Sequence, residues 1–213
     1  MSFQENINSV LSFNGEGLKN LINDEDSIYH VIVLIGLRAL IAGIGILLLG
    51  ILYPDTDFPE HFFLVAIRVT LARALLLVLF VFIFAGLLVF SLNKLGGTLQ
   101  TIHCFRIIGL TFIFDLIYDS IAMVIRLINI NNNLPWYVLV YIPAIFVIAA
   151  IVIGFTSDTK ISRRDILIAT VVCYIFSNIG SAMLYFLILS LIFSLFNPLS
   201  GESQVTILTI FSL

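Results

Sequence analysis

The sequence predicts an all-α integral membrane protein, in which a five-helix transmembrane bundle follows short amphipathic N-terminal helices. Three observations support this prediction. Of the 213 residues, 61% are hydrophobic, and the mean hydropathy is +1.15. Several apolar runs also reach about 20 residues, the length at which a helix crosses the hydrocarbon core of a bilayer. Five such helices and their loops use up the chain, so no separate soluble domain is expected.

Residues 1–29 form a polar, acidic leader with Lys19 as its one basic residue. The leader lacks the positively charged start of a secretory signal peptide, so the first apolar run is expected to remain a membrane span. Apolar residues recur at helical spacing on both sides of a break at Gly15 and Gly17, which predicts two short amphipathic helices. We weigh two hypotheses for them: packing beneath the bundle, or a partner-binding arm.

The five spans are predicted from the apolar runs and the breaks between them. Gly96 and Gly97 break the chain before the third span, and Ser162 with Asp165 makes a capping-box start for the fifth. Residues 197–213 form a C-terminal tail whose apolar stretch is too short to cross. The spans are expected at residues 30–53, 66–92, 105–129, 135–155 and 165–196.

The distribution of basic residues predicts the orientation. Five spans place the termini on opposite sides, and basic residues gather on the side that holds the leader. Arg68 and Arg126 lie toward the other side, as does the acidic stretch 55–60. We therefore expect a cytoplasmic N-terminus and an external or lumenal C-terminus. The residues counted for the cytoplasmic side are Lys19, Lys94, Arg106, Lys160, Arg163 and Arg164.

Two aspartates inside the third apolar run, Asp115 and Asp119, require an explanation. A carboxylate at the centre of a membrane helix costs about 2.5–3.5 kcal/mol on insertion scales, so it has a partner or lines a polar path. The helical rise places Arg38 roughly 12 Å and Asp115 roughly 15 Å from the cytoplasmic edge. Arg73, Asn178 and Asp119 all fall at roughly 20 Å. The sequence thus predicts one polar layer near the midplane.

Helical periodicity puts Asp115, Asp119 and Arg126 on one face of the third span, which must point into the bundle. Asp119 and Arg126 are seven residues apart, about 10 Å along the axis, so pairing between helices is expected instead. We predict Arg38 with Asp115 and Arg73 with Asp119. A layer that fixes helix register and a transport path are both compatible with these residues, and the equal number of acids and bases favours the structural role.

Glycines recur at seven-residue intervals on the first span, at Gly36, Gly43 and Gly50. A stripe of small residues lets a neighbouring helix approach closely. The stripe predicts a helix-packing seam, either inside the bundle or in a homo-oligomer.

Residues that carry chemistry are few. His30, His61 and His103 are far apart in the sequence and near membrane edges, and Cys104 and Cys173 have no metal or redox spacing. The sequence has no phosphate-binding Gly-rich loop with a Lys, no nucleophile elbow and no His-Glu-x-x-His motif. We expect a protein that is not an enzyme and that needs no cofactor or metal.

Two connecting segments, "LNKLGGTLQTIHCFRIIGL" and "AIVIGFTSDTKISRRDILIATVV", together with an acidic leader and five spans, resemble the Yip family of polytopic membrane proteins. The resemblance covers about residues 30–190 and implies a five-helix bundle with a cytoplasmic N-terminus. Eukaryotic members associate with prenylated Rab GTPases. They carry an Asp-Leu-Tyr-Gly-Pro segment before the first span, where this chain has "NDEDSIYHVI", so Rab binding is not carried over to any residue and a prokaryotic-like member is expected.

The sequence leads to two functional hypotheses. The first is a non-enzymatic multi-pass membrane scaffold or adaptor, whose partners are the lipid bilayer and membrane or cytoplasmic proteins, and which resides in the cell membrane if the source is prokaryotic. The alternative is a small transporter or permease subunit that uses Asp115 and Asp119 as a proton or substrate site. Neither hypothesis involves nucleic acid.

Overall fold

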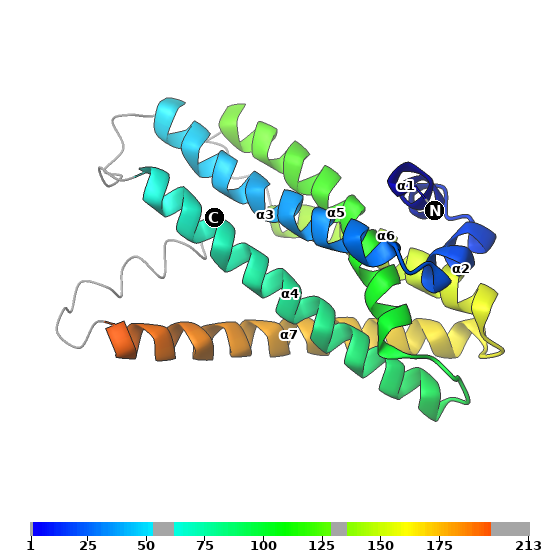
Figure 1. The fold of residues 1–213 in the computed structure, drawn as a ribbon. Helices are drawn as coiled ribbons and strands as arrows, with labels where there is room; N and C mark the ends of the chain where they lie inside the picture. The colour runs from blue at the N-terminus through cyan, green and yellow to red at the C-terminus, as the bar shows by residue number, and fades with distance from the viewer. Residues whose placement is uncertain (1, 53–61, 129–135, 197–213) are drawn as a thin grey trace.

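The computed structural model describes residues 2–52, 62–128 and 136–196, and these residues form seven helices and no strand (Figure 1). The all-α prediction is confirmed. The predicted tail, residues 197–213, lies outside the described residues. The helices are α1 (Phe3–Leu11), α2 (Gly15–Asn23), α3 (Ser27–Leu52), α4 (Phe62–Lys94), α5 (Thr101–Ile128), α6 (Trp136–Asp158) and α7 (Arg163–Phe196).

The five long helices, α3 to α7, coincide with the five predicted spans to within a few residues at each end. Four contain an apolar stretch long enough to cross a membrane: Ser27–Leu48, Phe63–Lys94, Thr101–Ile125 and Arg163–Ile188. The described part of α6 adds a shorter apolar stretch, Ile142–Asp158. The chain is therefore a multi-pass membrane protein by length and composition.

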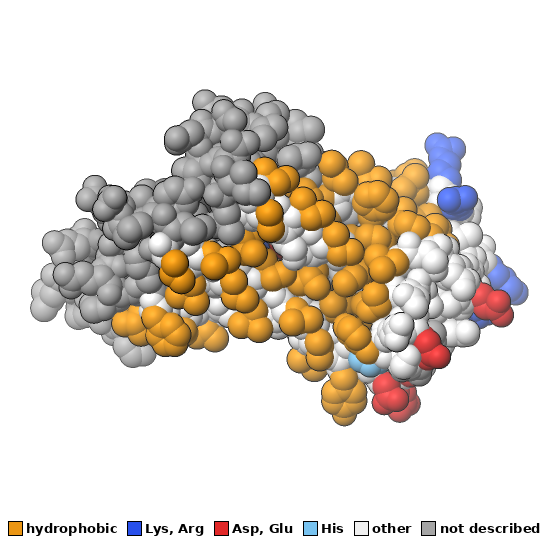
Figure 2. Space-filling view, turned by 90° about the horizontal axis from the view of Figure 1, so that it is seen from above, with side chains coloured by type: hydrophobic (Ala, Val, Ile, Leu, Met, Phe, Trp, Pro, Cys, Tyr) orange, Lys and Arg blue, Asp and Glu red, His pale blue; other side chains and the backbone are white. Residues whose placement is uncertain are grey.

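Apolar side chains cover much of the outer surface, and charged ones gather at the end of the bundle where α1 and α2 lie (Figure 2). Ile32 on α3, Leu71 on α4 and Phe176 on α7 are each more than half exposed. In water so large an exposed apolar surface would be unfavourable, whereas in a bilayer these side chains face lipid.

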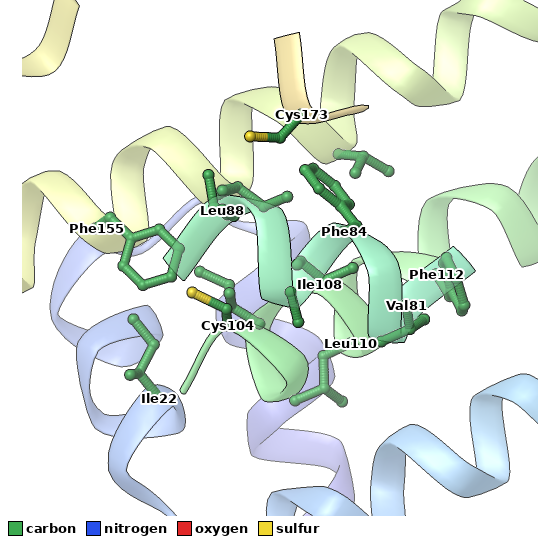
Figure 3. Close-up of a cluster of buried hydrophobic side chains, with 14 of the residues drawn as sticks. Ile22, Val81, Phe84, Leu88, Cys104, Ile108, Leu110, Phe112, Phe155 and Cys173 are labelled. Carbon is green, nitrogen blue, oxygen red and sulfur yellow. The ribbon is translucent and has the colours of Figure 1, made fainter. Parts of the chain in front are cut away.

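Helix α3 packs against both α4 and α5, while α6 contacts α5 and α7. The two longest helices, α4 and α7, cross each other (Figure 1). A core of buried apolar side chains fills the space between the seven helices (Figure 3). Its members come from the leader as well as from the spans, and include Ile22, Phe84, Leu88, Ile108, Phe112, Phe155 and Cys173.

The leader folds as two helices against one end of the bundle, which supports packing beneath the bundle over the partner-arm hypothesis. Val10, Leu18 and Leu21 have no exposed surface, and α2 contacts both α5 and α6. Phe13 links α1 to α2 in the left-handed region, at φ 52°, which is uncommon for a bulky residue. Its ring stacks on Phe114 at 5.5 Å between centroids, and this packing offsets the backbone strain.

The predicted chain breaks are present. Gly96 has φ +94°, a conformation that favours glycine, and lies in the turn after α4. Asn93 closes this turn, because its side chain bonds both the N–H and the carbonyl of Leu99, at 2.8 and 2.9 Å. The side chain of Ser162 accepts from the N–H of Asp165 and donates to its carboxylate, which confirms the predicted cap of α7.

The predicted glycine seam on α3 is correct at one position. A Cβ on Gly43 would lie 3.0 Å from the carbonyl oxygen of Ala66 and would collide with Thr70, so α3 and α4 approach closely there. Gly36 has nothing within 4 Å of its Cβ position, so it is not a packing residue, and the surroundings of Gly50 lie outside the described residues. Sequence reasoning missed Gly109 on α5, whose Cβ would collide with Val31 of α3.

Candidate functional site

Four charged side chains from three helices meet inside the bundle. Arg38 comes from α3, Arg73 from α4, and Asp115 and Asp119 from α5. The two aspartates are four residues apart, about one helical turn, so both point to the same side of α5. We call these four residues the charge cluster.

Arg38 bonds both aspartates. Its Nη1 donates to Oδ2 of Asp115 at 3.0 Å, and its Nε donates to Oδ2 of Asp119 at 2.9 Å. Arg73 Nη2 lies 3.8 Å from the same oxygen of Asp119, within ion-pair range but beyond hydrogen-bonding distance. Both predicted pairs are therefore present, and a third contact, Arg38 with Asp119, was not predicted.

The cluster is neutral as a whole, with two bases and two acids, and its centre is the most buried part. Side-chain exposure is 12% for Arg38 and 13% for Asp115, but 24% for Asp119 and 38% for Arg73. The guanidinium carbon of Arg38 also lies 5.0 Å from the ring centroid of Phe112, a cation–π contact. The charge of Arg38 thus has an aromatic neighbour in addition to two carboxylates.

Asn178 does not belong to the buried layer that the sequence predicts. Its side chain is exposed on α7 and donates to the carbonyl of Tyr174, 2.8 Å away in its own helix. Depth estimated from the helical rise does not fix the direction in which a side chain points. The side chain of Arg126, predicted on the aspartate face, lies outside the described residues.

Arg106 forms a second buried polar contact that sequence reasoning missed. Its position in the sequence predicts a basic residue at the cytoplasmic edge, yet it is only 6% exposed. Its Nη1 donates to the carbonyl of Ile22 in the last turn of α2, at 2.9 Å. A cation there satisfies an otherwise unpaired carbonyl and interacts favourably with the helix dipole. This contact ties the leader to the start of α5.

We expect Arg106→Met to weaken the docking of α2, because it removes a buried hydrogen bond from a charged group worth about 1.5–3 kcal/mol. Hydrogen exchange of the α2 amides should accelerate, while amides in the middle of α5 stay protected. The matched control is Arg164→Met, which removes an exposed arginine at the same end of the bundle. Unchanged exchange in α2 would contradict the proposed role of Arg106.

Asn6 makes a further contact between leader and bundle. Its Nδ2 lies 2.8 Å from Nδ1 of His30 and 3.4 Å from Oδ2 of Asp24. Partial burial opposes ionisation of Asp24, but hydrogen bonds that include those from Asn6 and from the N–H of Asp26 outweigh it and lower its pKa. Asn6 is fully buried, so these bonds hold α1 against the start of α3.

The cysteines and histidines form no catalytic arrangement in the described part of the chain. Cys104 and Cys173 are both buried and free, and the sulfur of Cys173 lies 3.3 Å from Oγ of Ser91. Among the residues that the structure describes, no group of three His, Cys, Asp or Glu side chains could hold a metal ion. His61 lies outside the described residues.

The charge cluster does not line either of two shallow grooves on the described surface. One runs along α4 from Gly86 to Lys94. The other, of about 280 Å³, lies between α6 and α7. The four side chains of the cluster contact one another where α3, α4 and α5 meet.

These features define a multi-pass α-helical membrane protein with a buried, charge-balanced cluster between its spans. Comparisons of the chain with protein-family models, with curated proteins and with solved structures find no match.

Proposed function

We propose that this chain is a non-enzymatic membrane scaffold or adaptor, in which the charge cluster holds α3, α4 and α5 in register. The observation that carries the proposal is that Arg38 donates to both Asp115 and Asp119. Each acid has a cationic partner, so the cluster has no surplus negative charge to bind a cation. Partner proteins then contact the exposed surface of the leader and the charged end of the bundle where it packs.

The resemblance to the Yip family supports this proposal and adds an orientation to it. The charged end of the bundle, with the N-terminus, lies on the cytoplasmic side, and the C-terminus is external or lumenal. The residence is the cell membrane if the source is prokaryotic. The partner is a membrane or cytoplasmic protein. A second copy of this chain, in a homo-oligomer, is one such partner.

The proposal is tested by site-specific photo-crosslinking in native membranes. A photoreactive side chain in place of Lys19, which is exposed on α2, is expected to give a discrete protein adduct. The control position is Ile179, exposed on the apolar face of α7, where lipid adducts are expected. Lipid adducts alone at both positions would contradict the scaffold proposal.

One observation favours the alternative, a small transporter. Asp119 and Arg73 form the more exposed edge of the cluster, and in this alternative Asp119 is the acid that exchanges a proton, although its Oδ2 also accepts from Arg38 at 2.9 Å. If so, Asp119→Asn abolishes a proton or solute flux that the wild-type chain supports in proteoliposomes. The scaffold proposal expects the wild-type flux to equal that of protein-free vesicles, and a flux lost with Asp119→Asn but kept with Arg68→Gln would overturn it.

A further inference from the structure

A groove lies between α6 and α7. Its lining is apolar along most of its length, and one end carries a basic residue. Its lining residues are Ile145, Ile148, Ala149, Val152, Leu167 and Arg163. Val152 is 4% exposed and lies deep in the groove, whereas Ile145 and Leu167 are 65% and 45% exposed. The first and last of the four α6 positions are seven residues apart, about 10 Å along the axis.

The charged mouth lies at the membrane edge. Arg163 is the first residue of α7, directly after the turn that follows α6, and the α6 lining descends from this end into the apolar part of the helix. Arg163, Arg164 and Lys160 are all exposed, and within the described ranges none of them has a carboxylate within ion-pair distance. The Asp165 carboxylate accepts from Ser162 in the cap of α7. The arginine head is thus available to an anion in the headgroup region, while its stem covers apolar surface.

We propose that this groove is a binding site for one anionic glycerophospholipid, with an acyl chain between α6 and α7 and the phosphate at Arg163. Charge complementarity selects this occupant, because the groove opens to lipid along its length and carries positive charge only at its headgroup end. A soluble ligand would have to enter the hydrocarbon core to reach Ile145. This site is independent of the charge cluster and of the scaffold proposal.

The test uses native mass spectrometry of the purified full chain, titrated with dioleoylphosphatidylglycerol or dioleoylphosphatidylcholine. The wild type is expected to retain the anionic lipid in preference to the zwitterionic one. Arg163→Gln is expected to weaken phosphatidylglycerol binding about fivefold, the effect of one basic side chain near a membrane surface. Arg164→Gln removes the same charge one residue away, outside the lining, and is expected to change binding by less than about twofold.

A second pair of variants tests the acyl-chain position without changing charge. Ala149→Leu, or the smaller Ala149→Val, fills the groove and is expected to weaken phosphatidylglycerol binding. Val172→Leu, on the exposed face of α7 and outside the lining, is expected to leave it unchanged. If Arg163→Gln and Arg164→Gln weakened phosphatidylglycerol binding equally, the effect would come from the net charge of this end and not from the groove. Full binding by folded Ala149→Leu and Ala149→Val would show that the chain does not occupy the groove, and either result overturns the proposal.

Discussion

Replacing Arg38 by methionine is expected to destabilise the bundle by about 3–5 kcal/mol, the cost of breaking a buried ion pair from one side. The substitution leaves Asp115 without its cation and Asp119 with only the 3.8 Å contact to Arg73. Two carboxyl groups would then remain between helices in an apolar environment, where they must either protonate or separate the helices. The measurement is unfolding of the purified protein in mixed micelles, with sodium dodecyl sulfate as denaturant and helicity as the signal.

Two further variants separate loss of the pair from loss of an arginine. Arg68→Met removes an exposed arginine from α4 and is expected to change stability by no more than about 0.5 kcal/mol. The double variant Arg38→Leu with Asp115→Leu removes one acid and one base and keeps the contact of Arg73 with Asp119. It should recover most of the lost stability, since apolar replacement of a buried pair is often neutral or stabilising. A double variant as unstable as Arg38→Met would show that the unpaired Asp115 does not cause the loss of stability.

The second large effect is expected at the crossing of α3 and α4. Gly43→Leu places a side chain where the carbonyl of Ala66 and the side chain of Thr70 already lie, and a backbone atom cannot move aside without shifting the helix. Overpacking of this kind costs about 1–3 kcal/mol and occasionally more. The same denaturant titration measures it, and retention of the wild-type midpoint would show that the helices can separate freely at this crossing.

Gly36→Leu is the matched control for this prediction. It makes the same substitution one heptad earlier on α3, where nothing lies within 4 Å of the Cβ position. Its effect is expected to stay within about 0.5 kcal/mol, because the new side chain meets open space. A loss of stability at Gly36 equal to that at Gly43 would mean that leucine itself, and not the helix crossing, causes the effect.

The charge cluster was largely predictable from the sequence. An unpaired charge in hydrocarbon is so unfavourable that each aspartate needs a basic partner, and few basic residues lie within the predicted spans. Depth along the helix axis was enough to match Arg38 with Asp115 and Arg73 with Asp119. It was not enough to show that Arg38 reaches both acids, since that depends on the rotation of α3 relative to α5. Asn178 on α7 is exposed for the same kind of reason, because the rotation of α7 about its own axis decides which of its side chains face the bundle.

Arg106 shows the opposite failure. Its position near the predicted start of a span made it one of the basic residues of the membrane edge, and nothing in its neighbours marked it as buried. Only the packing of α2 over α5 makes its guanidinium a cap for the Ile22 carbonyl. A charged residue at a span boundary has the same sequence signature whether water, lipid headgroups or another helix lies next to it.

The sequence by itself determined the fold class, the positions of the five long helices and the presence of paired charges between them. These follow from local properties: the length of each apolar run, the breaks at glycine and at helix caps, and the cost of an unpaired carboxylate in lipid. The tertiary structure alone decided that Gly43 and not Gly36 lies at a helix crossing, that the leader packs through Phe13 and Arg106, and that α6 and α7 enclose a groove. The physical reason is that periodicity fixes which residues share a face of one helix, whereas the angle and distance between two helices depend on all the side chains that interlock between them.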